Sequence, residues 1–326
     1  MNLTETKFFI GPMSKNIVDA ILQVNNDTPN VFAFIPSRRQ VEFDGGYVNN
    51  WTTQTFSEYV NKKMTIQRDH GGPLQGKVYD LGFHSFGIDA KHFDIIHVDP
   101  WKLNRHFSFN MHYTVDYIKY IHNINPNIYY EIGTEEAIKS FSPKQLETFL
   151  HTLRIMLSKD IFDKIKYAVV QSGVGLDVVN RKNIGNTCLK KLEEMISVCN
   201  SFGIMTKEHN GDYLSLDEIK QRFNLGLSAI NIAPEFGQIE TLCYLKEMTD
   251  REIDQYFHIC YKAGKWKKWV PLKFDPIANK IDLIITCGHY VLSNPEFLDI
   301  KPNINDKIIV EVKRKLQQLL GICNAE

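Results

Sequence analysis

Eight short runs of apolar, β-branched or aromatic residues recur along the chain, and each leads into a polar or Gly- or Pro-containing turn. The runs cover residues 7–11, 31–36, 64–69, 93–99, 128–133, 167–173, 203–210 and 228–234. Their starts lie 24 to 39 residues apart, which leaves room for a strand, a loop, a helix and a return loop in each unit. Eight such units predict an α/β protein with a (β/α)8 TIM barrel, a fold that needs about 250 residues.

The segments between the runs have the three- and four-residue apolar spacing of amphipathic helices. Clear examples are residues 16–26, 114–124, 142–157, 186–203 and 215–224. The expected N-caps are Ser140 or Ser142, Asn186, and Ser215 with Glu218 as its capping-box partner. A doubly wound open sheet is the alternative fold. Eight units, and the lack of a G-x-G-x-x-G motif after the first run, favour the closed barrel.

The periodic pattern changes past residue 240. We expect residues 1–250 to form the barrel that carries the functional site, and residues 251–326 to form a helical C-terminal extension. No Ser/Gly-rich linker separates the two parts, so the extension is expected to pack on the barrel.

Composition narrows the classes of function. The 38 basic and 38 acidic residues cancel, so no overall field recruits nucleic acid or an anionic membrane. The N-terminal segment lacks a signal-peptide pattern, and no stretch reaches the roughly 18 apolar residues of a membrane span. The six cysteines are scattered without a C-x-x-C pair, which argues against a disulfide framework or a zinc knuckle. We therefore expect a cytoplasmic protein that binds neither nucleic acid nor membrane.

Polar residues gather where the predicted strands end. The third to eighth runs all finish in ionisable or amide side chains, and in a barrel these strand ends meet at one mouth. Imidazoles and carboxylates that converge there are the ligand set of a divalent metal, with Zn²⁺ the preferred candidate. The expected ligands are His70, Glu131 and His209. His97 and Asp99 are expected to serve a second site or to orient a ligand.

Asp69 is the candidate for proton transfer. On an extended strand Asp69 and His70 would face opposite ways, but at a frayed strand end both can reach the mouth. A metal that polarises a carbonyl stabilises an enediolate, and a nearby carboxylate can move the proton. That pairing is the chemistry of metal-dependent aldol cleavage and of sugar isomerisation. Gly173 and Gly175 could cradle a phosphate, although a plain turn is the preferred interpretation.

Motifs after six of the runs also match one known family, in order, over residues 37 to 240. The matching residues are Ser37, Gln40, Val41, Gly45, Gly46 and Tyr47; Asp69, His70, Gly72 and Pro73; His97 and Asp99; Glu131, Ile132, Gly133, Thr134 and Glu135; Val169, Val170, Gln171, Gly173 and Val174; and His209, Asp212 and Tyr213. With these motifs the chain resembles the GatZ/KbaZ-type subunit family of class II tagatose-bisphosphate aldolase.

The resemblance implies a divalent metal at the barrel mouth and a sugar or sugar-phosphate substrate. Glu135 joins Asp69 as a candidate for proton transfer. The expected substrate-binding residues are Ser37, Gln40, Gln171, Gly173, Asp212, Tyr213 and Asn231. The chain departs from the family where Gln67 and Arg68 replace two glycines, and where Pro100, Trp101 and Lys102 replace small residues. These positions line the mouth, so we expect a substrate other than a tagatose bisphosphate.

Three functions compete. The leading hypothesis is a class II, metal-dependent aldolase-like lyase that acts on a sugar or sugar phosphate. The second is a non-catalytic accessory subunit that stabilises a catalytic aldolase subunit, because members of the family are usually described in that role. The third is a metal-dependent sugar isomerase or epimerase. The oligomeric state stays open, and a homo-oligomer is retained as an expectation.

Overall fold

The computed structural model describes residues 3–103, 106–134 and 142–323. Eight strands run parallel in one sheet of order β2-β1-β10-β9-β6-β5-β4-β3. They are β1 (Phe8–Ile10), β2 (Phe32–Phe34), β3 (Gln67–Gly71), β4 (Ile95–Val98), β5 (Tyr129–Ile132), β6 (Ile165–Val170), β9 (Met205–Glu208) and β10 (Ala229–Ile232). Each strand lies within one of the eight runs, except that β3 and β6 each extend two residues beyond theirs, β3 at its carboxyl end and β6 at its amino end.

The two end strands of that order, β2 and β3, meet and close the ring. Isolated parallel bridges join Phe34 to Ile66 and Ser37 to Asp69. The amide of Asp69 donates to the carbonyl of Pro36 at 3.0 Å. The sheet is therefore a (β/α)8 TIM barrel, and the open-sheet alternative is wrong.

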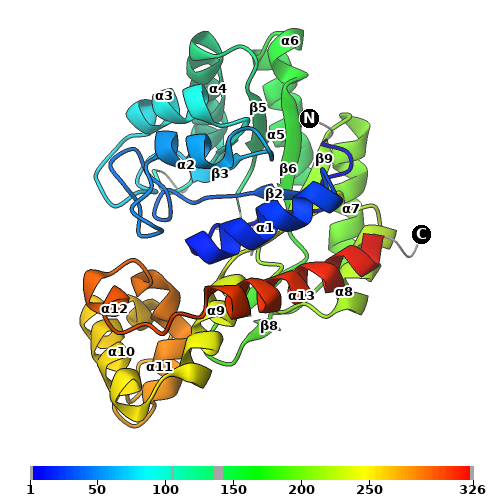
Figure 1. Ribbon diagram of the computed structural model, residues 1–326. Coiled ribbons are helices and arrows are strands. Elements are labelled where there is room, and N and C mark those ends of the chain that lie inside the picture. The colour runs from blue at the N-terminus through cyan, green and yellow to red at the C-terminus, as the bar shows by residue number, and fades with distance from the viewer. Residues whose placement is uncertain (1–2, 104–105, 135–141, 324–326) are drawn as a thin grey trace.

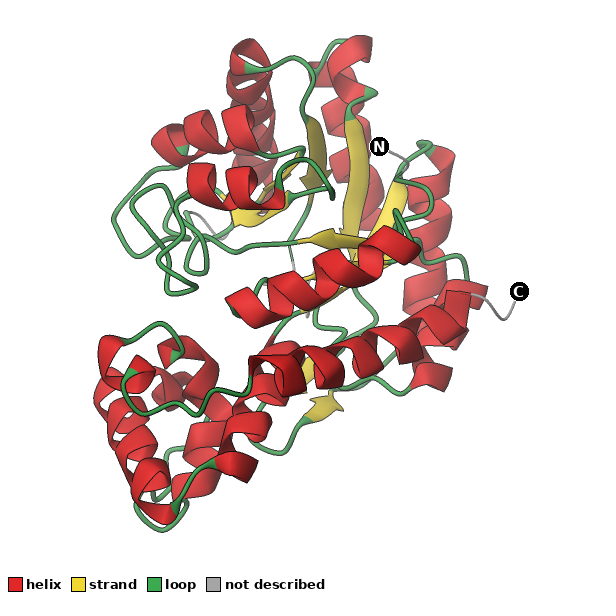
Figure 2. Ribbon diagram, viewed as in Figure 1, coloured by secondary structure: helices red, strands yellow, loops and turns green. Residues whose placement is uncertain are grey.

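Helices surround the strands, as Figures 1 and 2 show. The helices that alternate with strands are α1 (Lys15–Asp27), α2 (Thr53–Val60), α3 (Phe83–His92), α4 (Phe107–Ile124), α5 (Pro143–Met156), α6 (Lys159–Phe162), α7 (Leu189–Ser201), α8 (Leu216–Asn224) and α9 (Pro234–Glu247). The rest of the chain forms α10 (Asp250–Ala263), η1 (Lys265–Lys268), α11 (Lys280–Cys287), η2 (Gly288–Val291), α12 (Pro295–Leu298) and α13 (Asn305–Cys323). None of the described helices is both long and apolar enough to cross a membrane.

Two of the expected helix caps are confirmed. Ser142 caps α5, and Ser215 caps α8 in a capping box with Glu218. The expected cap Asn186 is wrong, because α7 begins only after Cys188. The chain before it forms the hairpin β7 (Gly175–Asp177) and β8 (Lys182–Ile184), and the Cys188 amide then donates to the Ser172 carbonyl at 2.7 Å.

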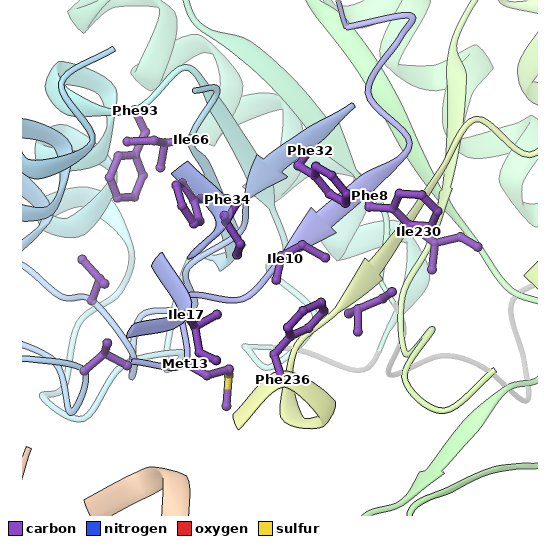
Figure 3. Close-up of a cluster of buried hydrophobic side chains, with 14 of the residues drawn as sticks. Phe8, Ile10, Met13, Ile17, Phe32, Phe34, Ile66, Phe93, Ile230 and Phe236 are labelled. Atoms are coloured by element: carbon purple, nitrogen blue, oxygen red, sulfur yellow. The ribbon is translucent and has the colours of Figure 1, made fainter. Parts of the chain in front are cut away.

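Apolar side chains are buried on both faces of the strands. One cluster lies between strands and helices and includes Phe8, Ile10, Phe32 and Phe34 (Figure 3). A smaller cluster consists of Leu3, Phe9, Ala33, Ile35, Ile95, Tyr167 and Ala229. Successive residues of a strand alternate between faces. The strand residues of this second cluster therefore point into the barrel interior, opposite to the residues of the first cluster.

The last helix lies against the first. Helix α13 packs on α1, α9 and α8, so the two ends of the chain share one part of the barrel wall (Figure 1). Its buried stripe is Ile308, Val312, Leu316, Leu319 and Ile322, at the three- and four-residue spacing of a helix face.

Candidate metal centre

Three imidazoles and one carboxylate meet at the carboxyl ends of β3, β4 and β9. One ligand atom from each of Asp69, His70, His97 and His209 lies within 4.8 Å of all the others. The ring centroid of His70 lies 5.0 Å from the centroid of His97 and 5.0 Å from that of His209. The centroids of His97 and His209 are 5.2 Å apart. The barrel therefore brings together side chains that lie far apart in the sequence.

An irregularity in β3 lets two consecutive residues reach this cluster. The register between β3 and β4 shifts between Arg68 and Gly71. Within that bulge His70 has a φ of 43°, a left-handed conformation that side chains rarely adopt. Its Nε2 consequently lies 3.5 Å from Oδ1 of the preceding Asp69. A regular strand would have turned one of the two away from the mouth.

A carboxylate orients the ring of His70. Its Nδ1 lies 2.7 Å from Oδ2 of Asp99. Burial alone would raise the pKa of Asp99, but the hydrogen bond and charge of His70 hold that pKa below its ordinary value. An ionised carboxylate can only accept, so Nδ1 carries a proton, and Nε2 is the ring nitrogen near Asp69.

The ring of His209 is oriented in the same way by Glu131. Its Nε2 lies 2.7 Å from Oε1 of Glu131, and its Nδ1 lies 3.8 Å from Oδ1 of Asp69. Burial opposes ionisation of Glu131, yet the charge of Lys207 and the hydrogen bond from His209 hold its pKa well below the ordinary value. Nε2 therefore donates, and Nδ1 is the ring nitrogen on the side of Asp69.

His97 is fully buried between these two rings. Its Nε2 lies 2.9 Å from the carbonyl oxygen of Gly133, a group that only accepts. The lone pair is therefore on Nδ1, which accepts a hydrogen bond from the backbone N–H of His70 at 3.3 Å. Burial lowers the pKa of His97, so the ring is neutral and able to bind a metal at physiological pH.

The donor set fits a divalent ion with affinity for nitrogen. Three imidazoles and a carboxylate form a ligand set that Zn²⁺ accepts, whereas Mg²⁺ prefers oxygen throughout. Oδ1 of Asp69 is buried and, among the described residues, has no hydrogen-bond partner. An unsatisfied carboxylate oxygen is costly in such a place, and a cation would remove that cost.

Two amides predicted to bind substrate are likewise buried without partners. Both side-chain polar atoms of Gln171 and both of Asn231 lack a hydrogen bond within the described part of the chain. Gln171 follows β6 and Asn231 lies on β10, so both belong to the barrel that carries the cluster. Unsatisfied amides of this kind can bind hydroxyl groups of a ligand.

Other predicted substrate-binding residues hold loops together. The Gln40 side chain accepts from the Ser37 amide at 2.8 Å, and Ser37 bridges to Asp69. Oδ1 of Asp212 accepts from the amides of Ala233 and Glu235, which fixes the start of α9. In the structure, Ser37, Gln40 and Asp212 therefore hold the backbone of their loops through hydrogen bonds.

Three predicted site residues are still to be placed: Gly173 and Tyr213, expected to bind substrate, and Glu135, expected to transfer a proton. Gly173 lies at the base of the β7–β8 hairpin with a φ of 102°. The hydroxyl of Tyr213 donates to the side chain of Gln238 at 2.7 Å. Glu135 lies outside the described residues.

Sequence reasoning gave Lys207 no role and treated Gln67 only as a departure from the family, whereas both lie directly below the cluster. Nζ of Lys207 is 2.5 Å from both Oε2 of Glu131 and Oε1 of Gln67. Both are odd-numbered residues two positions before a residue of the cluster, Asp69 or His209. That two-residue spacing places them on the same inward face of the strands as the cluster, and it is the signal that could have identified them.

A (β/α)8 barrel with a cluster of imidazoles and a carboxylate at its mouth defines a class of proteins suited to metal-assisted chemistry on small polar molecules. No protein-family model matches this chain, and no curated protein matches it by sequence. Solved structures do match. A probable tagatose 6 phosphate kinase from Sinorhizobium meliloti 1021 has a TM-score of 0.78 at 15% identity, over 98% of this chain and 100% of that one.

Two structures that carry the name aldolase also match over most of their length. The fructose-bisphosphate aldolase of Campylobacter jejuni has a TM-score of 0.56 at 13% identity, over 97% of this chain and 90% of that one. The YdjI aldolase of Escherichia coli K12 has a TM-score of 0.53 at 13% identity, over 95% and 93%. At such identities the likeness establishes a shared fold.

Proposed function

We propose that this protein is a metal-dependent lyase of the class II aldolase type, which cleaves a carbon–carbon bond of a sugar or sugar phosphate. The observation that carries the proposal is the meeting of Asp69, His70, His97 and His209 within 4.8 Å. The aldolases among the structural neighbours support the reaction class. The expected metal is Zn²⁺, because three of the four donors are imidazoles.

The chain's own residues suit this reaction. Cleavage of a β-hydroxy carbonyl compound removes the hydroxyl proton, breaks the carbon–carbon bond and leaves the electron pair beside the carbonyl, where a proton is later taken up. A divalent ion held by the cluster would stabilise the negative charge that develops on the carbonyl oxygen. Asp69 is the carboxylate placed to move the proton, because its Oδ1 has no other described hydrogen-bond partner. The unsatisfied amides of Gln171 and Asn231 would hold substrate hydroxyl groups.

Metal analysis and product analysis of the purified chain test the proposal together. Mass spectrometry should find about one zinc per chain, and a panel of ketoses and ketose phosphates should include one that yields two smaller carbonyl compounds. EDTA should abolish that turnover, and Zn²⁺ should restore it. The His209→Ala variant should lose metal and activity, while the control His151→Ala, on the exposed face of α5, should keep both.

Each competing function gives a different result. Stoichiometric metal or unchanged turnover in His209→Ala would refute the assignment. An isomerase or epimerase would give a product with all carbons of the substrate. An accessory subunit would be metal-free, would turn over nothing alone and would co-purify with a catalytic partner.

A further inference from the structure

A fully buried ion pair lies beneath the candidate metal centre, inside the barrel. Nζ of Lys207 is 2.5 Å from Oε2 of Glu131, and both side chains are 0% exposed. Lys207 also donates to the side-chain oxygen of Gln67, whose amide donates to the same Glu131 oxygen. The three residues come from β9, β5 and β3 and form a closed set of hydrogen bonds.

The surroundings of this ion pair are apolar. Nζ of Lys207 lies 3.5 Å from the ring centroid of Phe9 and 4.4 Å from that of Tyr167. An apolar set of the same volume would often be as stable as a buried ion pair, or more stable. The stability of the barrel therefore does not by itself account for a lysine at this position.

The ion pair does have one consequence for the metal centre. Glu131 has two oxygens, and Oε2 is taken by Lys207 and Gln67, which come from different strands. Only Oε1 remains for His209, at 2.7 Å from Nε2. The carboxylate is held from two sides, so the plane of the His209 ring and the nitrogen that bears its proton are fixed.

We propose that Lys207 and Gln67 are positioning residues, which hold Glu131 so that His209 presents its Nδ1 lone pair to a divalent ion. The proposal rests on the proposed metal centre. Lys207 itself contacts neither metal nor substrate, because its amine is enclosed by Glu131, Gln67 and the two aromatic rings.

Zinc affinity of the full-length chain measures this role without any substrate. Competition with a chromophoric chelator at fixed pH gives the dissociation constant of each variant. Lys207→Met, which keeps the length of the side chain but removes its donors, should weaken Zn²⁺ binding by at least about tenfold. Gln67→Leu removes one of the two supports of Glu131 and should weaken binding by about threefold.

The control is another buried ion pair, between Arg222 and Glu208, at 2.8 Å on the outer face of β9. Arg222→Met should lower the melting temperature but leave the zinc affinity within about twofold of wild type. A merely structural role of Lys207 would make the two variants behave alike.

The metal-free protein gives a second readout. With ¹⁵N-labelled histidine, and with His209→Gln to assign the signals, the His209 ring should appear as the single tautomer protonated at Nε2. In Lys207→Met the two tautomers should become mixed. If Lys207→Met does not fold, Gln67→Leu decides by the same two measurements.

The outcomes separate this inference from the proposed function. If wild type binds zinc and both variants bind it equally well, the positioning role is wrong and the metal centre stands. If wild type binds no zinc, the proposed function fails, and the tautomer of His209 still decides whether Lys207 and Gln67 orient the ring.

Discussion

Asp69 has two candidate roles, as a metal ligand and as the group that moves a proton. Its Oδ1 lies 3.5 Å from Nε2 of His70 and 3.8 Å from Nδ1 of His209, which is compatible with either role. An asparagine at position 69 would distinguish the two roles. An asparagine oxygen can still face a cation, but an amide cannot accept the proton of a substrate hydroxyl.

We predict that Asp69→Asn separates the two roles. The three imidazoles should still bind zinc, so the metal content should stay near that of wild type. The turnover number should fall by roughly 10²- to 10⁴-fold, the range for loss of a general acid or base. Zinc stoichiometry and turnover are measured on the same sample. A variant that loses its metal would make Asp69 primarily a ligand.

His289 is a buried histidine far from the metal centre in sequence. It is 1% exposed, its ring centroid lies 4.1 Å from that of Tyr290, and its Nδ1 has no partner in the described part of the chain. Burial, and to a smaller extent the charge of Lys268, lower the pKa of His289 to about 3. The unfolded chain takes up this proton near pH 6.5, so stability is present above that pH and is lost as the pH falls from 6.5 toward 3.

We therefore predict that the free energy of unfolding of His289→Phe depends less on pH below pH 7 than that of wild type. Between pH 7 and pH 5, wild type should lose about 2 kcal/mol of unfolding free energy relative to the variant. Urea unfolding at the two pH values measures the difference. Parallel profiles for the two proteins would show that His289 does not remain neutral in the folded state.

The residues that the sequence identified are those whose position at a strand end could be recognised by pattern. His70 follows a run, His97 and His209 lie near the ends of theirs, and in a barrel all such ends meet. The shared role of Lys207 and Gln67 was not found, because it depends on a contact between strands. The partner of Lys207 is Glu131 on another strand, and a local pattern carries no information about that contact.

At the scale of elements, the eight strands could be predicted because each is a short apolar run with a turn after it. The bulge in β3 could not, because it depends on tertiary contacts. The backbone nitrogen of His70 meets Nδ1 of His97, and the amide of Asp99 donates to the carbonyl of Gly71 at 2.9 Å. The cap of α7 was misplaced for a related reason, since the β7–β8 hairpin uses the residues before it.

Gly72, which follows the bulge, is predicted to be irreplaceable. It has a φ of 131°, and a Cβ atom there would lie 2.9 Å from the carbonyl oxygen of Asp99. Gly72→Ala should cost about 3 kcal/mol of unfolding free energy and weaken zinc binding, because Asp99 orients His70. Gly203→Ala is the control, with a φ of 72° and no atom within 4 Å. It should cost about 1 kcal/mol and leave zinc affinity unchanged. Equal costs would show that the contact with Asp99 is unimportant.

At the scale of the whole molecule, α13 joins the end of the chain to its beginning. Leu316 is 0% exposed in the buried stripe of α13, the helix that packs on α1, α8 and α9. Leu316→Ala should lower the unfolding free energy by about 2–5 kcal/mol, since the barrel wall cannot collapse fully onto the cavity. Val310→Ala, on the same helix but 63% exposed, should change it by less than about 0.5 kcal/mol. Denaturant melts of both variants test this, and a small effect of Leu316→Ala would show that α13 is dispensable for the barrel.

The metal centre should also stabilise the whole barrel. Its donors come from the carboxyl ends of β3, β4 and β9, which lie together only when the ring is closed, so the folded chain should bind zinc far better than the unfolded chain. At a free Zn²⁺ concentration of 100 times the dissociation constant, binding adds about 2.7 kcal/mol. For a chain of this size that corresponds to a rise of roughly 5 °C in melting temperature.

The expected rise should depend on the metal and on the ligands. Mg²⁺ should have little effect, because imidazole nitrogen suits it poorly. The double variant His70→Ala/His209→Ala should show no zinc-dependent rise, even if its melting temperature without metal is close to that of wild type. Differential scanning fluorimetry over separate zinc and magnesium titrations of wild type and of the double variant measures these changes in melting temperature. An equal rise in the double variant would mean that zinc binds elsewhere on the protein, and the barrel mouth would then need another ligand to satisfy Asp69.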